Sequence, residues 1–122
     1  FVCTHNSARS QFAQALWRGC SDVPAASAGT APARRIHPKA VSVAKAHGVL
    51  LDGQPSQLTD GDFDDALVIS VCDNADETLD REHLHWSVPD PARADRVVDF
   101  RTAYDLIEAR IGTLASSMKE QS

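Results

Sequence analysis

The chain of 122 residues is 43% hydrophobic and 24% charged, which is the composition of one soluble globular domain. Its net charge of -5 argues against a nonspecific nucleic-acid surface, because such a surface needs a basic face, but leaves room for one local anion site. We therefore expect no nucleic-acid partner. No apolar run approaches the roughly 20 residues that cross a bilayer, so we expect no membrane partner either. The cysteine usage described below makes a reducing cytoplasm the expected location.

The first elements in chain order are a strand, a loop and a helix. Residues 1–3 indicate the tail of a short apolar strand, residues 4–7 are small and polar as in a loop, and residues 9–17 predict a helix. Gly19 is expected to end this helix. Apolar residues four positions apart form its apolar stripe, namely Phe12 with Leu16 and Ala13 with Trp17.

The middle of the chain predicts a second strand at residues 25–28 and a second helix from His37-Pro38 to Gly48. Val41 and Ala44 of this helix are expected to face the core. The connecting segments are predicted as two polar loops and one acidic helical turn, at residues 29–36, 52–59 and 60–65.

Residues 66–71 form a nearly continuous apolar run, which predicts a strand buried on both faces, and residues 84–88 predict another short strand. The final helix is the clearest element, and we expect it to fray after Met118. Its apolar residues recur at intervals of three and four: Phe100, Tyr104, Ile107, Ile111, Leu114 and Met118. Alternating strands and helices predict an α/β fold, with a parallel sheet covered on both faces in a single domain spanning residues 1–122.

The three cysteines, Cys3, Cys20 and Cys72, are an odd number without a C-x-x-C pair. This usage argues against a disulfide scaffold and against structural zinc, and His37, His83 and His85 are not spaced like a metal cluster. We therefore predict no metal site. The chain opens two residues before its most informative motif, so we expect the natural N-terminus further upstream, after a few more residues or another domain.

Cys3 begins a C-x5-R-S motif between the first strand and the first helix. Five intervening residues let the backbone curl so that successive N–H groups point inward, and the curl ends at a helix N-terminus, whose dipole adds positive charge at the same place. Arg9 can close this ring with a bidentate contact to a tetrahedral oxyanion. The predicted oxyanion-binding residues are therefore Thr4, His5, Asn6, Ser7, Ala8, Arg9 and Ser10.

The same positive field favours a thiolate at Cys3, which would make it an activated nucleophile. Ser10 can donate a hydrogen bond to Cys3, and Asn6 and Ser7 can brace the loop. The alternative is a buried structural thiol, because cysteines at strand ends are commonly core residues.

Asp90 lies between two prolines, which stiffen its backbone. Hydrolysis through a cysteinyl intermediate needs a general acid for the leaving group and later a base for water, and Asp90 can serve as both. The alternative is that Pro89-Asp90-Pro91 is simply a turn. Arg34 and Arg35 either line the entrance to the site or are solvated loop charges.

Residues 1–11 (FVCTHNSARSQ) resemble the phosphate-binding loop of low-molecular-weight protein tyrosine phosphatases and of the arsenate reductases built on their fold. Further similar segments follow in order: SAGT at 27–30, HPKA at 37–40, VISVC at 68–72 and HWSVPDPA at 85–92. The resemblance implies a four-stranded parallel sheet flanked by helices, in flavodoxin-like layers. It also implies Cys3 as the nucleophile, Arg9 as the oxyanion ligand and Asp90 as the acid and base.

The approach to Asp90 resembles the arsenate reductase branch, and Cys72 matches the position of its second redox cysteine. The implied reaction is attack of Cys3 on arsenate, then attack of Cys72 on Cys3 with release of arsenite. If Cys72 is only a core residue, the protein is instead a phosphatase that hydrolyses phosphomonoesters through a phosphocysteine. A noncatalytic oxyanion sensor is a third possibility, although a sensor needs neither Cys3 nor Asp90.

The sequence departs from that branch in two ways. No third cysteine follows Cys72 in residues 73–79, so no bound cofactor but an external thiol is expected to complete the cycle: thioredoxin, mycothiol or glutathione. Gln14 and Gln57 stand where some arsenate reductases hold a potassium ion with acidic side chains, so no such site is predicted.

Overall fold

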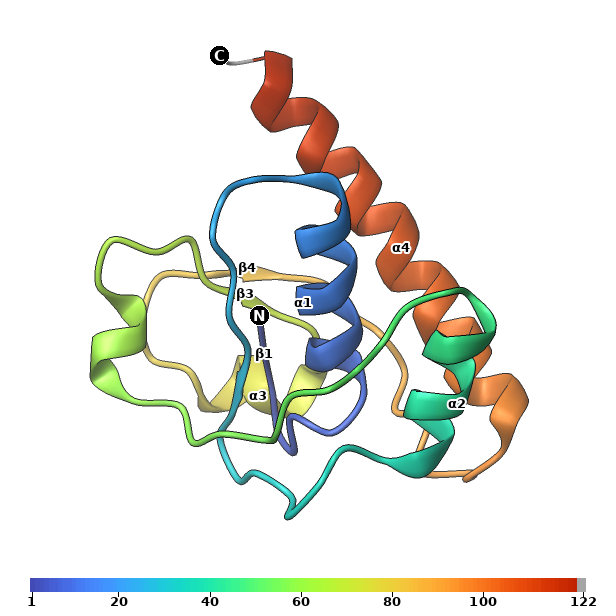
Figure 1. The fold of residues 1–122 in the computed structure, drawn as a ribbon. Coiled ribbons are helices and arrows are strands. Elements are labelled where there is room, and N and C mark those ends of the chain that lie inside the picture. The colour runs from blue at the N-terminus through green and yellow to red at the C-terminus, as the bar shows by residue number, and fades with distance from the viewer. Residues whose placement is uncertain (121–122) are drawn as a thin grey trace.

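The computed structural model describes residues 1–120 and contains one four-stranded sheet (Figure 1). All strand pairs are parallel, and the strand order is β2-β1-β3-β4. The strands are short: β1 Val2–Cys3, β2 Ala28–Gly29, β3 Ile69–Ser70 and β4 Leu84–His85. The four-stranded parallel sheet flanked by helices is confirmed, and β1 lies in its interior, where both neighbours are parallel strands.

Four α-helices and one 3-10 turn accompany the sheet: α1 Arg9–Cys20, α2 Pro38–Ala46, the turn Asp60–Phe63, α3 Asp73–Thr78 and α4 Val97–Glu120. Helix α4 packs along α1 and α2, while α3 contacts β1 and β3. Figure 1 shows α4 crossing behind α1 and α2, with α3 near the lower end of the strands.

The seam between α1 and α4 is built from the stripe that the sequence predicted. Phe12 meets Tyr104 edge-on, with ring centroids 5.3 Å apart. Phe100, Tyr104, Ile107 and Ile111 are all buried, and each such side chain contributes about 1.5–3 kcal/mol by leaving water. Leu114 is half-buried and Met118 exposed, so the stripe reaches solvent toward the end of α4, and residues 121–122 of the expected frayed tail lie outside the described chain.

One predicted helix end and one predicted core residue differ from the structure. Gly19 does not end α1, which continues to Cys20, because the helix closes through an extended Ser21 whose N–H donates to Trp17 O. A glycine stop needs a left-handed backbone, and that conformation occurs instead at Gly48 (φ 75°), which does close α2 as predicted. In α2, Ala44 is buried but Val41 only half-buried, because the core face is formed by Ala40, Val43 and Ala44.

Strand predictions were too long. Of residues 66–71, the first two are exposed, and only Ile69–Ser70 pair as β3, so this run is buried from Val68 onward. The second strand is shifted to Ala28–Gly29. Helix α3 was missed, because five of its six residues are polar and a single alanine, Ala75, gives no apolar period.

Candidate functional site

The loop between β1 and α1 curls around the sulfur of Cys3. The backbone N–H of Asn6 donates to Cys3 Sγ over 3.1 Å, and Ser10 Oγ lies 2.9 Å from the same sulfur. Cys3 itself is 3% exposed at the base of the loop. The predicted neighbours Cys3, Asn6 and Ser10 are therefore brought together.

Asn6 holds the loop in its shape. Its backbone is left-handed (φ 51°), a conformation that asparagine tolerates better than most residues, and its side chain is fully buried. Its Nδ2 donates to Ser10 Oγ (2.6 Å), and its Oδ1 accepts from Ser56 N (3.0 Å) and Gln11 Nε2 (3.2 Å). Sequence reasoning named Asn6 as a brace but missed Gln11 and Ser56.

A second segment, residues 29–37, supports the loop from outside. Gly29 must be a glycine, because a Cβ there would lie 2.6 Å from Thr4 O. The amides of Thr30, Ala31, Ala33 and His37 donate to the carbonyls of Cys3, Thr4, His5 and Ser7 over 3.1, 2.8, 2.9 and 2.9 Å. Because a peptide's N–H points opposite to its C=O, outward carbonyls turn the amides that follow them inward, as an anion ring requires.

Arg9 and Asp90 meet across the mouth of this loop. Arg9 is the first residue of α1, and its Nη1 donates to Val88 O over 2.8 Å while Nη2 lies 3.7 Å from Asp90 Oδ1. The Arg9 side chain is 11% exposed and that of Asp90 is 45% exposed. The Asp90 carboxylate also accepts from Ala92 N (3.0 Å), which fixes its direction locally.

Cys72 lies beside the same loop as the N-cap of α3, and it is 1% exposed. Its Sγ accepts from Ala75 N over 3.3 Å and lies 3.4 Å from Thr4 Oγ1, which in turn accepts from Asn74 Nδ2 over 2.8 Å. Cys20 is exposed at the last position of α1, outside this arrangement.

Polar contacts that the sequence did not reveal link α3 to the segment before Asp90. Asp73 Oδ1 accepts from His85 Nε2 (2.8 Å) and Ser87 Oγ (2.9 Å), and the other ring nitrogen of His85 lies 2.6 Å from Ser70 Oγ. The hydrogen bond from His85, followed by that from Ser87, lowers the pKa of Asp73 below its usual range. The segment that leads to Asp90 is thus tied to the first turn of α3.

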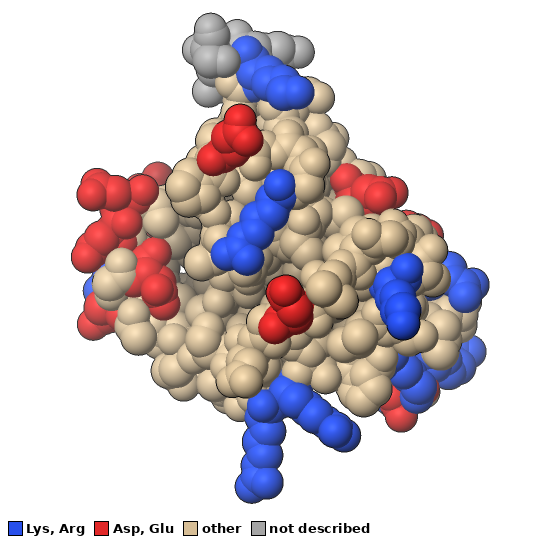
Figure 2. All heavy atoms as spheres, viewed as in Figure 1, with Lys and Arg blue, Asp and Glu red and all other residues tan. Residues whose placement is uncertain are grey.

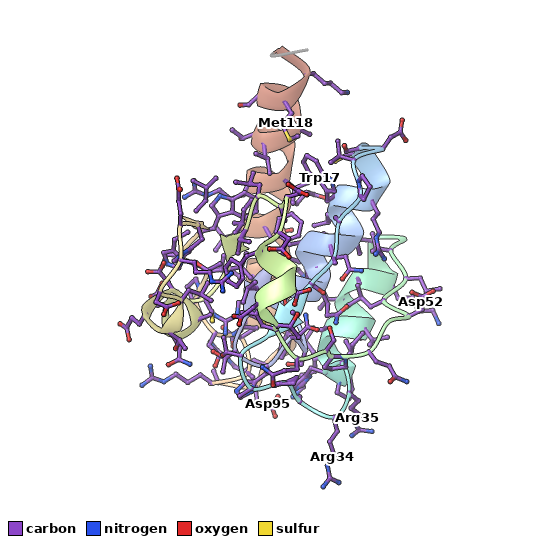
Figure 3. All side chains as sticks on the ribbon, turned by 90° about the vertical axis from the view of Figure 1, so that its left-hand side faces the viewer. Trp17, Arg34, Arg35, Asp52, Asp95 and Met118 are labelled. Carbon is purple, nitrogen blue, oxygen red and sulfur yellow. The ribbon has the colours of Figure 1, made fainter. Side chains whose placement is uncertain are left out.

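The remaining polar residues lie at the rim. His5 is exposed, with Nδ1 3.1 Å from Ala31 O, and Arg34 and Arg35 are exposed and point away from the body of the protein (Figure 3). Figure 2 shows basic side chains projecting at the end where this loop lies, whereas acidic ones gather over the Asp60–Phe63 turn.

Gln14 and Gln57, the two residues at the potassium positions discussed above, both form hydrogen bonds within the protein. Gln14 Oε1 accepts a hydrogen bond from Ser27 Oγ, and Gln57 Nε2 donates to backbone carbonyls of residues 29, 30 and 58. Within residues 1–120, no group of three His, Cys, Asp or Glu side chains could hold a metal ion. No helix in the same range is long and apolar enough to span a membrane.

Comparison with known proteins identifies relatives over the whole chain. The model of the family described as low molecular weight phosphotyrosine protein phosphatase matches residues 1–122. An arsenate reductase of Halalkalibacterium halodurans is 31% identical over 133 residues, and the match covers 98% of this chain and 95% of that protein.

Two solved structures are similar to this chain. The arsenate reductase of Archaeoglobus fulgidus has a TM-score of 0.78 and 28% identity, covering 95% and 97% of the two chains. The YwlE arginine phosphatase of Geobacillus stearothermophilus has a TM-score of 0.87 and 25% identity, covering 99% and 92%.

Proposed function

Because the chain belongs to the low molecular weight phosphotyrosine protein phosphatase family, we propose that it reduces arsenate to arsenite, with Cys3 as nucleophile and Cys72 as resolving thiol. One observation carries the choice of reaction. A second buried thiol, Cys72, lies 3.4 Å from the side chain of Thr4, the residue that follows Cys3. Hydrolysis of a phosphoester needs no second thiol, whereas reduction of arsenate does.

The oxyanion is bound by inward amides of residues 4–10 and by the guanidinium of Arg9. The geometry supports this, because the outer segment takes up four loop carbonyls and the positive end of α1 faces the same space. Two hydrogen-bond donors, Asn6 N–H and Ser10 O–H, reach the sulfur of Cys3, which suits a thiolate ready to attack.

The reaction then proceeds in two displacements. The Cys3 thiolate attacks arsenic(V), forming a sulfur–arsenic bond, while one arsenate hydroxyl takes up a proton from solvent and leaves as water. The Cys72 thiolate next attacks the Cys3 sulfur, so that a disulfide forms, the sulfur–arsenic bond breaks and its electron pair stays on arsenic. Arsenite leaves as arsenic(III), and the two cysteines together have lost two electrons.

The second displacement requires α3 to move. Because Val2 pairs with Ser70, Thr4 lies level with Cys72, and Cys3 lies level with Val71. Side chains alternate along strands, so Cys72 faces Thr4 and not Cys3. A disulfide needs both Cβ atoms to face each other, which requires the first turn of α3 to unwind.

An external thiol returns the pair to the reduced state. No third cysteine follows Cys72 in residues 73–79, so the electrons come directly from thioredoxin or another dithiol, or from a small thiol such as mycothiol or glutathione. A dithiol gives up two electrons and two protons, leaving two thiols here and a disulfide on the donor.

A second candidate is hydrolysis of phosphomonoesters by the same loop. The observation that favours it is Asp90, which lies 3.7 Å from Arg9 and remains half-exposed at the mouth, where a leaving group would sit. Asp90 would protonate that leaving group and then activate water to attack the phosphocysteine.

The decisive measurement is arsenite release by purified protein without added thiol. We expect about one arsenite per chain together with a Cys3–Cys72 disulfide in the wild type and in Cys20→Ser, the matched control. Neither product should form with Cys3→Ser or Cys72→Ser. No arsenite from any form, with or without mycothiol or glutathione, alongside steady aryl phosphate hydrolysis, would replace the reductase by the phosphatase. Arsenite that appears only after addition of mycothiol or glutathione would make the external thiol, and not Cys72, the resolving group.

A further inference from the structure

The turn that follows Asp90 is fastened to the start of α2. Lys39 Nζ lies 2.9 Å from Asp95 Oδ1 and donates to Asp95 O over 2.5 Å, and His37 Nε2 lies 3.3 Å from the same carboxylate oxygen. None of the reaction steps above uses these three side chains. In Figure 3, Asp95 lies at the same end of the molecule as Arg34 and Arg35.

Asp95 adopts a conformation that needs outside support. Its backbone is left-handed (φ 55°), and its N–H donates to Pro91 O over 3.3 Å, which closes the turn of residues 91–95. Residues in this region persist where surrounding contacts hold them. Lys39, and to a lesser degree His37, lowers the pKa of the Asp95 carboxyl, so the contact is intact at neutral pH and is lost only in acid.

His37 connects this contact to the loop of residues 3–9 between β1 and α1, here called the oxyanion loop. Its backbone N–H donates to Ser7 O over 2.9 Å, and its ring packs on Phe100 with centroids 4.5 Å apart. Because Nδ1 accepts from Lys39 N over 3.1 Å, the hydrogen of the neutral ring lies on Nε2, where it faces Asp95. One residue therefore joins the loop, α2, α4 and the turn.

We infer that His37, Lys39 and Asp95 form a clamp that positions Asp90 over the oxyanion loop, an inference that rests on the acid role proposed for Asp90. The segment that carries Asp90 is anchored at both ends, at Val88 by Arg9 and at Asp95 by Lys39. Between these anchors Asp90 itself is half-exposed. Loss of the rear anchor frees the turn and lets the carboxylate drift from the leaving group.

Leaving-group dependence separates positioning from general damage. Asp95→Asn removes the charge but keeps a residue that tolerates the left-handed backbone, and Lys39→Met keeps the alkyl chain. We expect either change to slow hydrolysis of phenyl phosphate about tenfold, a fraction of the roughly hundredfold or greater contribution of a general acid. Both rates are compared as kcat/KM, which excludes the later attack of water on the phosphocysteine. For nitrophenyl phosphate, whose leaving group needs little protonation, kcat/KM should fall less than about twofold.

Two further variants complete the design. Asp99→Asn breaks the neighbouring ion pair with Arg96 (2.8 and 3.0 Å) without touching the site, so it should leave both rates unchanged. Adding Asp95→Asn to Asp90→Asn should cause no further loss. If Asp90→Asn slows phenyl phosphate hydrolysis and Asp95→Asn does not, the clamp is wrong while the acid role stands. If Asp90→Asn has no effect, the acid role and the clamp both fail.

Amide hydrogen exchange tests the clamp without turnover. Exchange of the 92–96 amides should rise about fivefold in Asp95→Asn and in Lys39→Met, as expected for loss of a partly exposed ion pair, and should not change in Asp99→Asn. Unchanged exchange in both clamp variants would overturn the inference whatever the rates show.

Discussion

Single ionisable contacts hold α3 against β4, and one of them makes stability depend on pH. His83 donates from Nδ1 to Arg81 O and from Nε2 to Asp76 Oδ1, both over 2.6 Å. The backbone carbonyl first, and then Asp76, raise the pKa of His83 above its ordinary value of 6.5, because two acceptors favour the ring with both protons. Asp76 also faces Ser70 Oγ at 3.5 Å and His85 Nδ1 at 3.8 Å.

The sign of the effect follows from the raised pKa. The contribution of His83 to the free energy of unfolding is complete below about pH 6.5 and is lost as the pH rises through the higher folded-state pKa. Between about pH 6 and pH 8, urea denaturation of His83→Gln should therefore show a smaller decline in stability than the wild type. Asp76→Asn, which removes the partner, should flatten the profile as well; an unchanged slope in both variants would contradict this account.

For single residues, the sequence predicted contacts between residues that are close in sequence and missed contacts between residues that are far apart in sequence. The spacing of Cys3, Arg9 and Ser10 was enough to place them around one loop, because eight consecutive positions leave the backbone few choices. Ser56 supports Asn6 through its backbone N–H from 50 positions away, and Val88 receives Arg9 through its carbonyl from 79 positions away. Backbone groups are the same in every residue, so no side-chain pattern indicates such contacts.

Elements were predicted where apolar periodicity is strong and missed where a cap or a polar contact decides. Helix α4 follows its stripe, whereas α3 starts at the N-cap Cys72 and has Ala75 as its one apolar residue. The short strands are another case, because they are fixed by close backbone approach and not by side chains. Gly29 is the clearest example, since β2 approaches the oxyanion loop only where no Cβ intervenes.

Two separate glycine substitutions, one in β2 and one in α4, test this interpretation of β2. Gly29→Ala would place a Cβ 2.6 Å from Thr4 O, and neither backbone can yield because Gly29 N and O are bonded to Ser56 and Leu58 (both 2.8 Å). We expect a loss of about 2–3 kcal/mol in stability by chemical denaturation, with loss of activity. Gly112→Ala in α4, where nothing lies within 4 Å of the new Cβ, should instead gain up to about 1 kcal/mol. Equal stability changes in the two variants would contradict a steric role for Gly29.

In the whole molecule, the candidate site residues lie at one end of the sheet, beyond the carboxyl ends of the strands. All four strands are parallel, so their carboxyl ends meet there, and each leads into a part of the site. Strand β1 leads to the oxyanion loop, β2 to its outer support, β3 to Cys72 and β4 to the segment of Asp90 (Figure 1). Topology therefore brings together residues separated by up to 87 positions in sequence, from Cys3 to Asp90, which the alternation of strands and helices predicts only in outline.

This convergence makes oxyanion binding a property of the entire fold. The loop is bonded to α1, to the 29–37 segment and to Ser56, so an anion that binds only the folded loop stabilises all of them together. In Cys3→Ser, which lacks the nucleophilic thiol, phosphate at about a hundredfold excess over its Kd should add about 2.7 kcal/mol to stability. For a domain of this length that corresponds to a rise of about 10 °C in Tm, measured by thermal unfolding. Arg9→Met in the same background should abolish the rise in Tm. Arg101→Met, which changes an exposed side chain of α4, should preserve it. A shift that survives Arg9→Met would mean that the anion binds elsewhere, and the loop would lose its assignment as the oxyanion site.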